Sequence, residues 1–210
     1  MKRSILTLCT LAFSATLASA QLSFDGGAHA GLAFASFPKP VSDYYGTGFL
    51  FGAHGDLNII KYFAVRLNLD YATFASNKDK IKTALANANG VQASDIGFDG
   101  LNTSDFSVFV NGLGKIPIQG APITPYGLVG FGLNFLSASD GTVTYQGTAQ
   151  PQAGIKGDSS TKFGLNFGAG SEFRVASKVK LLLEFKYVIV FTDNESTSYF
   201  PIVVGASFGI

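Results

Sequence analysis

The feature that most constrains this chain is an alternation of apolar and polar side chains with a period of two residues. In residues 63–71 the alternate positions divide into two sets. The apolar set is Phe63, Val65, Leu67, Leu69 and Tyr71, and the other set is Ala64, Arg66, Asn68 and Asp70. Because successive side chains of a β-strand point to opposite faces, this segment is expected to form a strand with one apolar and one polar face.

The same alternation recurs along the whole chain. It is found in residues 24–36, 47–58, 63–71, 105–116, 125–136, 162–174, 179–191 and 199–210. In the fourth of these segments Phe109 and Leu113 interrupt the pattern. After residue 20 no uncharged apolar run reaches the roughly 18 residues that a transmembrane helix needs. The sequence therefore predicts eight strands.

The distribution of side chains between the two faces indicates what surrounds these strands. Large apolar residues lie on one face, whereas charges and most glycines lie on the other. A soluble β-sandwich would expose the polar face and need many charges there, yet only 14% of the residues are charged, against about 25% in a typical soluble domain. In a membrane barrel the apolar face meets lipid, and closure pairs every strand edge. The predicted fold is all-β, an eight-stranded antiparallel up-and-down transmembrane β-barrel, with a soluble sandwich as the alternative.

The lengths of the connections support the barrel. Connections near residues 59–61, 117–124 and 175–178 are short or moderate, whereas those at 37–46, 75–104 and 137–161 are longer. The last of the alternate connections, 192–197, is brief. Outer-membrane barrels have short periplasmic turns and longer external loops. A sandwich gives no reason for this alternation.

The first twenty residues have the layout of a secretory signal peptide. A positive start at Lys2 and Arg3 precedes an apolar stretch and the small-residue site Ala18-Ser19-Ala20. We expect cleavage before Gln21, which leaves residues 21–210 as the barrel domain, exported through the periplasm to the outer membrane. Cys9 is the only cysteine, so a thiolate metal site or cysteine nucleophile in the mature protein is not expected. A net charge of +1 argues against a nucleic-acid partner.

Three segments resemble strands of a known bacterial family. They are Ile123-Thr-Pro-Tyr-Gly-Leu-Val-Gly-Phe-Gly-Leu-Asn-Phe135, Phe163-Gly-Leu-Asn-Phe-Gly-Ala-Gly-Ser-Glu-Phe173 and Lys180-Leu-Leu-Leu-Glu-Phe-Lys-Tyr187. The chain is thereby similar to the small eight-stranded outer-membrane barrels of Gram-negative bacteria, such as the OmpA transmembrane domain and OmpX. The resemblance spans essentially the whole mature chain. It implies an architecture and a location in the cell envelope more than an activity.

Charged side chains on the polar faces are expected to lie in the lumen. The set is His29, His54, Asp56, Arg66, Asp70, Glu172, Arg174, Glu184 and Lys186. Eight strands enclose a space that side chains just fill, so these charges must pair with one another. The favoured interpretation is a structural plug, and the alternative is a narrow gated ion path. Inward glycines such as Gly130 and Gly170 are expected to make room for long neighbouring side chains.

The two histidines lie on neighbouring predicted strands. If the first hairpin turns near residues 41–42, His29 and His54 lie opposite each other, about 5 Å apart. Two imidazoles can share a metal or act as a proton switch, but the sequence offers no third ligand. We therefore expect a hydrogen-bonded pair, with no metal and no cofactor.

An enzymatic role has less support from these residues. Acyl chemistry needs a serine, a base and an orienting acid within hydrogen-bond reach, and Ser104-Asp105 is the nearest fragment. Neither histidine lies beside a serine in the sequence, so the chain is predicted to be no enzyme. With no tryptophan in the chain, the interfacial aromatic belts must use tyrosine and phenylalanine. The candidates are Tyr62, Tyr126, Phe135, Tyr187 and Tyr199.

The external loops are the expected carriers of function. Residues 76–90 predict a short helix capped by Ser76 or Asn77 and ended by Gly90, and Thr142–Tyr145 is expected to extend the strands above the membrane. The predicted role is structural or adhesive, by a monomer that contacts outer-membrane lipid and lipopolysaccharide. Loops 76–104 and 137–161 are the expected contacts to an extracellular partner. A small channel or carrier for small hydrophobic solutes is the first alternative, and a lipid-modifying enzyme is the second.

Overall fold

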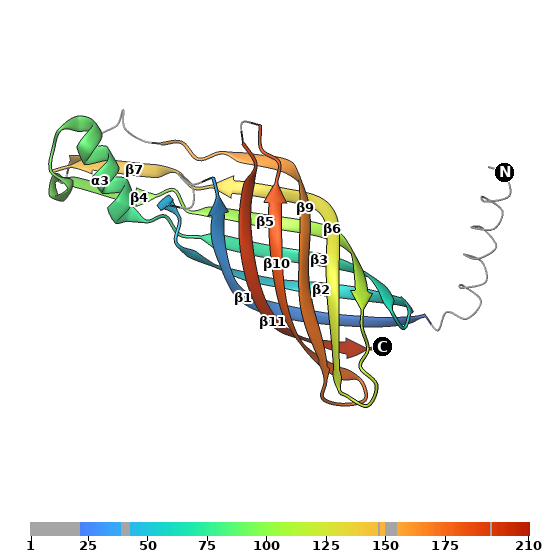
Figure 1. Ribbon diagram of the computed structural model, residues 1–210. Helices are drawn as coiled ribbons and strands as arrows, with labels where there is room; N and C mark the ends of the chain where they lie inside the picture. Colours follow the sequence, from blue (N-terminus) through green and yellow to red (C-terminus); the bar gives the residue numbers. More distant parts are fainter. Residues whose placement is uncertain (1–21, 39–42, 147, 150–154, 194) are drawn as a thin grey trace, which may run out of the picture.

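Eight long antiparallel strands close into a barrel (Figure 1) in a computed structural model that describes residues 22–38, 43–146, 148–149, 155–193 and 195–210. The barrel strands are β1 (Ser23–Phe37), β2 (Thr47–Ile60), β3 (Phe63–Phe74), β5 (Thr103–Lys115), β6 (Ile123–Ala138), β9 (Ser159–Arg174), β10 (Val179–Val190) and β11 (Thr197–Gly209). Each pairs with the barrel strand before it, and β1 pairs with β11 to complete the circle. The predicted barrel of eight strands is confirmed. The signal segment expected at residues 1–20 lies outside the described residues.

The two ends of the barrel differ in their connections. Residues 61–62, 116–122 and 175–178 link the strands at one end, which we call the short-turn end. The C-terminus lies at this end (Figure 1). The opposite, long-loop end carries residues 75–102 and 139–158, which leave and re-enter the barrel. The predicted alternation of short and long connections is confirmed for these segments, and the connection between Val190 and Thr197 at the long-loop end is brief, as expected.

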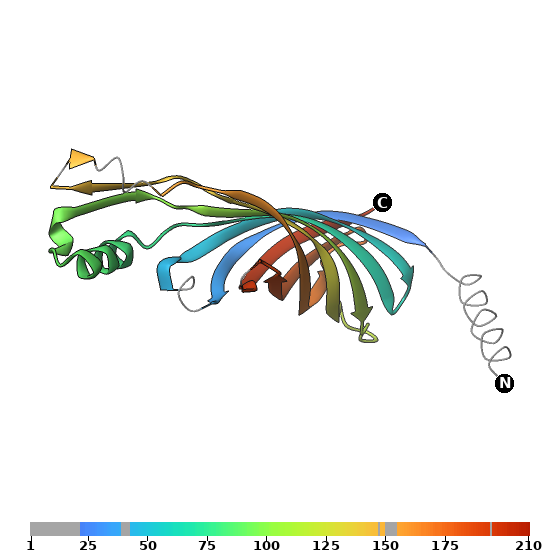
Figure 2. The same cartoon turned by 90° about the horizontal axis from the view of Figure 1, so that it is seen from above.

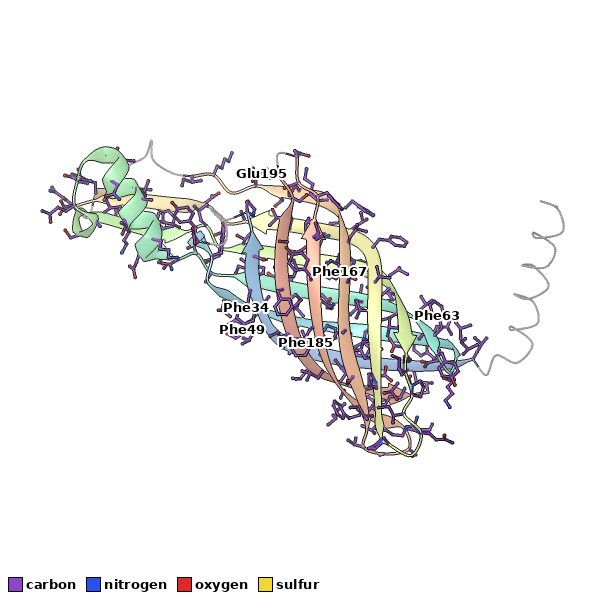
Figure 3. The ribbon with its side chains drawn as sticks, in the orientation of Figure 1. Phe34, Phe49, Phe63, Phe167, Phe185 and Glu195 are labelled. Carbon is purple, nitrogen blue, oxygen red and sulfur yellow. The ribbon has the colours of Figure 1, made fainter. Side chains whose placement is uncertain are left out.

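The outer surface of the barrel is apolar. Phe49 and Val129 are each 65% exposed, and Phe131 is 58% exposed. Phe49, Phe167 and Phe185 are labelled in Figure 3 among these outward side chains. Phe167 also packs beside Tyr187 of the next strand, with ring centroids 5.5 Å apart. A soluble sandwich would bury these residues between its sheets, so the outward apolar face excludes that alternative.

Several residues face the interior instead of the membrane surface. Phe109 and Leu113, which interrupt the alternation in β5, are 1% and 0% exposed and point into the barrel. The prediction that Tyr126 and Tyr199 belong to aromatic belts is wrong, because both side chains are buried inside. The reason is their place in the alternation: each tyrosine lies an even number of positions from the inward-facing residues of its own strand, so it faces inward too.

The two longest loops fold together into a small structure that we call the outer module. It consists of α3 (Lys78–Asn89), the 3-10 turn η1 (Ala93–Asp95), β4 (Ile96–Gly100), β7 (Gly141–Tyr145) and β8 (Thr148–Ala149). The predicted helix caps are confirmed, because the Asn77 side chain accepts a hydrogen bond from the Lys80 amide and Gly90 has a φ of 66°. None of the helices among the described residues is long and apolar enough to cross a membrane.

The outer module has its own apolar core. Strand β4 from the first long loop pairs with β7 from the second, and α3 lies against them. Ala86, Ile96, Phe98 and Val143 form the buried cluster between these elements. Seen from above, the module projects to one side of the barrel (Figure 2).

Candidate functional site

Arg66 is the centre of the buried polar interior. Its Nε and Nη2 donate to the two carboxylate oxygens of Asp56 at 2.6 and 2.7 Å, and its Nη1 donates to Glu184 Oε2 at 2.7 Å. The Tyr126 hydroxyl also donates to Glu184 Oε2, and its ring centroid lies 5.3 Å from the guanidinium. Bidentate pairing of this kind satisfies both charges and fixes the arginine geometrically. Arg66 is 1% exposed, so the pairing is what allows the charge to be buried.

Lysines on either side of Arg66 extend these contacts. Lys186 Nζ donates to Asp70 Oδ2 at 2.9 Å and lies 3.4 Å from Glu184 Oε1. Towards the short-turn end, Lys115 Nζ donates to Glu172 Oε1 at 2.9 Å. We call the connected set the charge network. It comprises Asp25, His29, His54, Asp56, Arg66, Asp70, Lys115, Glu172, Lys180, Glu184 and Lys186.

The charge network contains most of the residues predicted for it, with one difference and three additions. Arg174 is exposed at the short-turn end and forms no ion pair with another described residue, because β9 ends at that position. Asp25, Lys115 and Lys180 were missed, although all three have inward parity on their strands. Lys180 Nζ donates to Asp25 Oδ2 at 2.6 Å. Asp25 lies one residue after Phe24 in the alternating segment 24–36, and this inward parity was the available signal.

Inward glycines make space for two long side chains of this interior. A Cβ at Gly170 would lie 2.5 Å from the Tyr126 hydroxyl oxygen, and one at Gly130 would overlap the Asn111 side chain. Any larger residue at these positions would therefore displace its neighbour. The prediction that inward glycines accommodate long side chains is confirmed for this pair.

The two histidines meet inside the barrel, but by a different register from the expected one. In the β1–β2 ladder His29 lies opposite Gly52, and His54 lies opposite Gly27, a shift of two residues. Their Nδ1 atoms are nevertheless 3.2 Å apart, so one donates a hydrogen bond to the other. His29 Nε2 is bonded to Asp70 Oδ1 at 2.7 Å. The result is a chain from Asp70 through His29 to His54.

Among the described residues, the series Asp70–His29–His54 has neither a third metal ligand nor a serine hydroxyl beside it. In the described part of the protein, no cluster of three or more His, Cys, Asp or Glu side chains is arranged to hold a metal ion. Neither histidine hydrogen-bonds a serine hydroxyl in the same residues. Asp105, the acid of the Ser104-Asp105 fragment, accepts its hydrogen bond from Tyr199.

A second interior region lies mostly towards the long-loop end, and we call it the apolar layer. It consists of Ala33, Leu50, Ala72, Phe74, Phe109, Leu182, Val188, Val190, Tyr199 and Val203. All of these side chains are buried within the barrel. An interior lined only by charged and small residues was expected, so the apolar layer corrects that expectation.

The comparisons with known proteins agree with this architecture. The sequence profile of the family described as outer membrane protein beta-barrel domain matches residues 5–208. A search of the curated proteins gives no significant match.

Solved structures with the same fold include three from bacterial outer membranes. Neisserial surface protein A is 18% identical with a TM-score of 0.56, covering 88% of this chain and 96% of its own. A major outer membrane protein of Thermus thermophilus is 15% identical with a TM-score of 0.53, covering 89% and 99%. The N-terminal barrel domain of Pseudomonas aeruginosa OprF is 12% identical with a TM-score of 0.50, covering 91% and 99%.

The profile match extends over nearly the whole chain, and the closed barrel has the apolar exterior that a bilayer requires. The short-turn end is accordingly periplasmic and the long-loop end faces outside the cell. This protein belongs to the outer membrane protein beta-barrel domain family, and it is an integral protein of the bacterial outer membrane.

Proposed function

We propose that this protein is a non-enzymatic surface protein whose outer module binds an extracellular partner, while the barrel anchors that module and supports membrane integrity. The observation that carries the proposal is the pairing of β4 with β7, which come from different loops and enclose a common core. Ordering two long loops costs conformational entropy, and a shared core offsets that cost. Loops free to drift in sequence have no need of such a core.

The geometry of the outer module suits recognition. It projects beyond the barrel strands at the long-loop end (Figure 2). Lys78 and Asp99 form an exposed ion pair at 2.7 Å, and this contact lowers the pKa of Asp99 below its ordinary value. Binding residues on loops that a rigid scaffold supports are common among proteins. One of the structural neighbours carries the name of a surface protein, which is in keeping with such a role.

Contacts with the membrane belong to the same proposal. The apolar outer wall contacts lipid acyl chains, and the rim at the long-loop end contacts lipopolysaccharide. We infer that the protein acts as a monomer. The filled interior favours a structural plug over the channel alternative, and the absence of a serine partner for either histidine in the described residues disfavours the enzyme alternative.

The test is a pair of variants in cells that lack the native protein. One variant replaces residues 76–102 and 140–157 with short turns, and the other carries Lys162→Gln on the barrel rim as a control. We expect the loop variant to keep the barrel's heat-dependent electrophoretic shift but to lose binding to host cells and matrix proteins. Unchanged binding would contradict the proposal. Loss of barrier function against detergent in the loop variant would assign integrity to the module instead of the barrel.

The channel alternative has its own test. The purified protein in planar bilayers is expected to show no conductance steps, because the charge network and the apolar layer together fill the lumen. Steps that change size in Arg66→Gln or Glu184→Gln would show that ions pass along the charge network.

A further inference from the structure

A small cavity lies at the outer mouth of the barrel, at the outer end of the apolar layer. It has a volume of about 210 Å³ and is lined by the outer ends of six strands and by Tyr45. Phe74, Leu136, Val190 and the Tyr199 ring supply apolar walls. Drug-sized ligands occupy pockets of about 300 to 1,000 Å³, so this cavity suits a smaller molecule.

A carboxylate stands in this apolar cavity. Asp105 is 3% exposed and lines the wall on β5. Its Oδ2 accepts a hydrogen bond from the Tyr199 hydroxyl at 3.0 Å, whereas its Oδ1 has no partner in the described residues. The nearby Thr103 hydroxyl, which also lines the cavity, is buried without a partner among those residues as well.

Asp105 differs in this respect from the other buried carboxylates. Asp56, Asp70, Glu172 and Glu184 each have a lysine or arginine within hydrogen-bond distance. Asp105 forms no ion pair with any described residue, and one hydroxyl is its hydrogen-bond donor there. Burying an uncompensated carboxylate is costly, and the cost is relieved either by a proton on the carboxyl group or by a cation beside it.

The walls of the cavity favour the same kind of ligand. Phe74 and Tyr199 pack edge to face with centroids 5.6 Å apart, and aromatic rings attract ammonium groups when water is excluded. An ammonium carries three donors, and Asp105 Oδ1 and the Thr103 hydroxyl offer two acceptors for them. The other apolar side chains of the cavity can contact the hydrocarbon part of such a ligand.

We propose that the outer mouth of this barrel binds a small organic ammonium ion, with the charged nitrogen on Asp105 and an apolar body against Phe74 and Tyr199. The apolar layer beneath closes the cavity, so the ligand is held at the mouth and does not pass through. This site is separate from the outer module and does not depend on the adhesive role proposed above.

The test uses two probes of the same shape, phenethylammonium and neutral 2-phenylethanol, titrated into the refolded protein in detergent micelles by calorimetry. We expect phenethylammonium to bind at least tenfold more tightly than 2-phenylethanol. Asp105→Asn should weaken the ammonium at least tenfold and leave the alcohol unchanged. Asp99→Asn, a matched change on the exposed outer module, should alter neither. Equal binding of the two probes, or equal binding by wild type and Asp105→Asn, would overturn the proposal.

A second measurement avoids any dependence on the folding of a variant. Phenethylammonium is titrated into isotope-labelled wild-type protein, and the amide resonances are followed by NMR. The proposal predicts saturable shifts at Ala35, Thr103, Asp105 and Tyr199. Shifts confined to the outward apolar residues, as expected when the probe only partitions into the micelle, would overturn it.

Discussion

The charge network and the apolar layer fill the barrel interior in opposite ways. Towards the periplasm, the charge network holds Arg66 and three lysines against five carboxylates, and nearly every charge has a partner within 3 Å. Towards the outside, the apolar layer packs Leu50, Phe109 and Val203 with almost no exposure. The first region depends on geometry and complementary charge, and the second on volume. The contrast teaches that alternation along a strand specifies only which side chains point inward, since both kinds of filling are compatible with the same wall.

Breaking the charge network should have the largest effect on stability. Arg66→Met removes the guanidinium that bridges Asp56 and Glu184 and leaves Lys186 as the cation beside Glu184, and removing one partner of a buried pair costs about 3 to 5 kcal/mol. The free energy of unfolding, measured by urea titration with circular dichroism, should fall by that amount.

The control for this change is Arg174→Met, which removes the same kind of side chain at an exposed position of the short-turn end. It should leave the unfolding midpoint within error. Adding Glu184→Gln to Arg66→Met should recover part of the loss, because the two sites are coupled. A fully additive double variant would contradict the account of the network.

Creating a cavity in the apolar layer should lower the free energy of unfolding by a comparable or smaller amount than breaking the charge network. Leu50 is 2% exposed, and Leu50→Ala is expected to cost about 2 to 5 kcal/mol through lost burial and an unfilled space. Its effect should add to that of Arg66→Met, since Leu50 lies opposite Gly31 and Ala72, away from the Asp56 and Glu184 carboxylates that Arg66 contacts. Strong coupling between Leu50 and Arg66 would mean that the interior behaves as one unit.

Removing a single hydroxyl group should cause the smallest loss of stability. One such change in each region allows the two regions to be compared directly. Tyr126→Phe removes the donor to Glu184, and Tyr199→Phe removes the donor to Asp105, each worth about 1.5 to 3 kcal/mol when the acceptor is charged. Glu184 retains Arg66 and Lys186, whereas Asp105 retains no partner among the described residues. Tyr199→Phe should therefore destabilise the protein more than Tyr126→Phe, and the reverse order would contradict the assignment of Asp105 as the unpaired carboxylate.

The sequence was sufficient to predict the strands that form the wall of the barrel. A period of two fixes the face of each residue, and a shift by one residue would turn every outward side chain inward, so the strands and their orientation follow from the pattern alone. The caps of α3 were also predictable, because Asn77 and Gly90 act through local backbone geometry.

The sequence alone could not predict which side chains contact one another across the barrel. Hairpin register depends on the length and type of the turn, which the sequence left open, and the observed pairing of His29 and His54 differs from the expected one by two residues. The partners of Arg66 come from three strands and the pairing of β4 with β7 joins two loops, so neither has a local signal. The tyrosines at 126 and 199 were misassigned because residue type was given more weight than inward parity.

The most direct test of the whole account is the orientation of the side chains on one membrane strand. Single cysteines carrying spin labels are introduced at successive positions 128–135 of β6, in residues 21–210, which contain no other cysteine. In lipid bilayers, labels at 129, 131, 133 and 135 are expected to collide with oxygen dissolved in the hydrocarbon, and labels at the intervening positions to be shielded from it. Oxygen accessibility without this period of two, or access of a water-soluble nickel reagent to positions 129 and 131, would contradict the assignment of the apolar face to lipid.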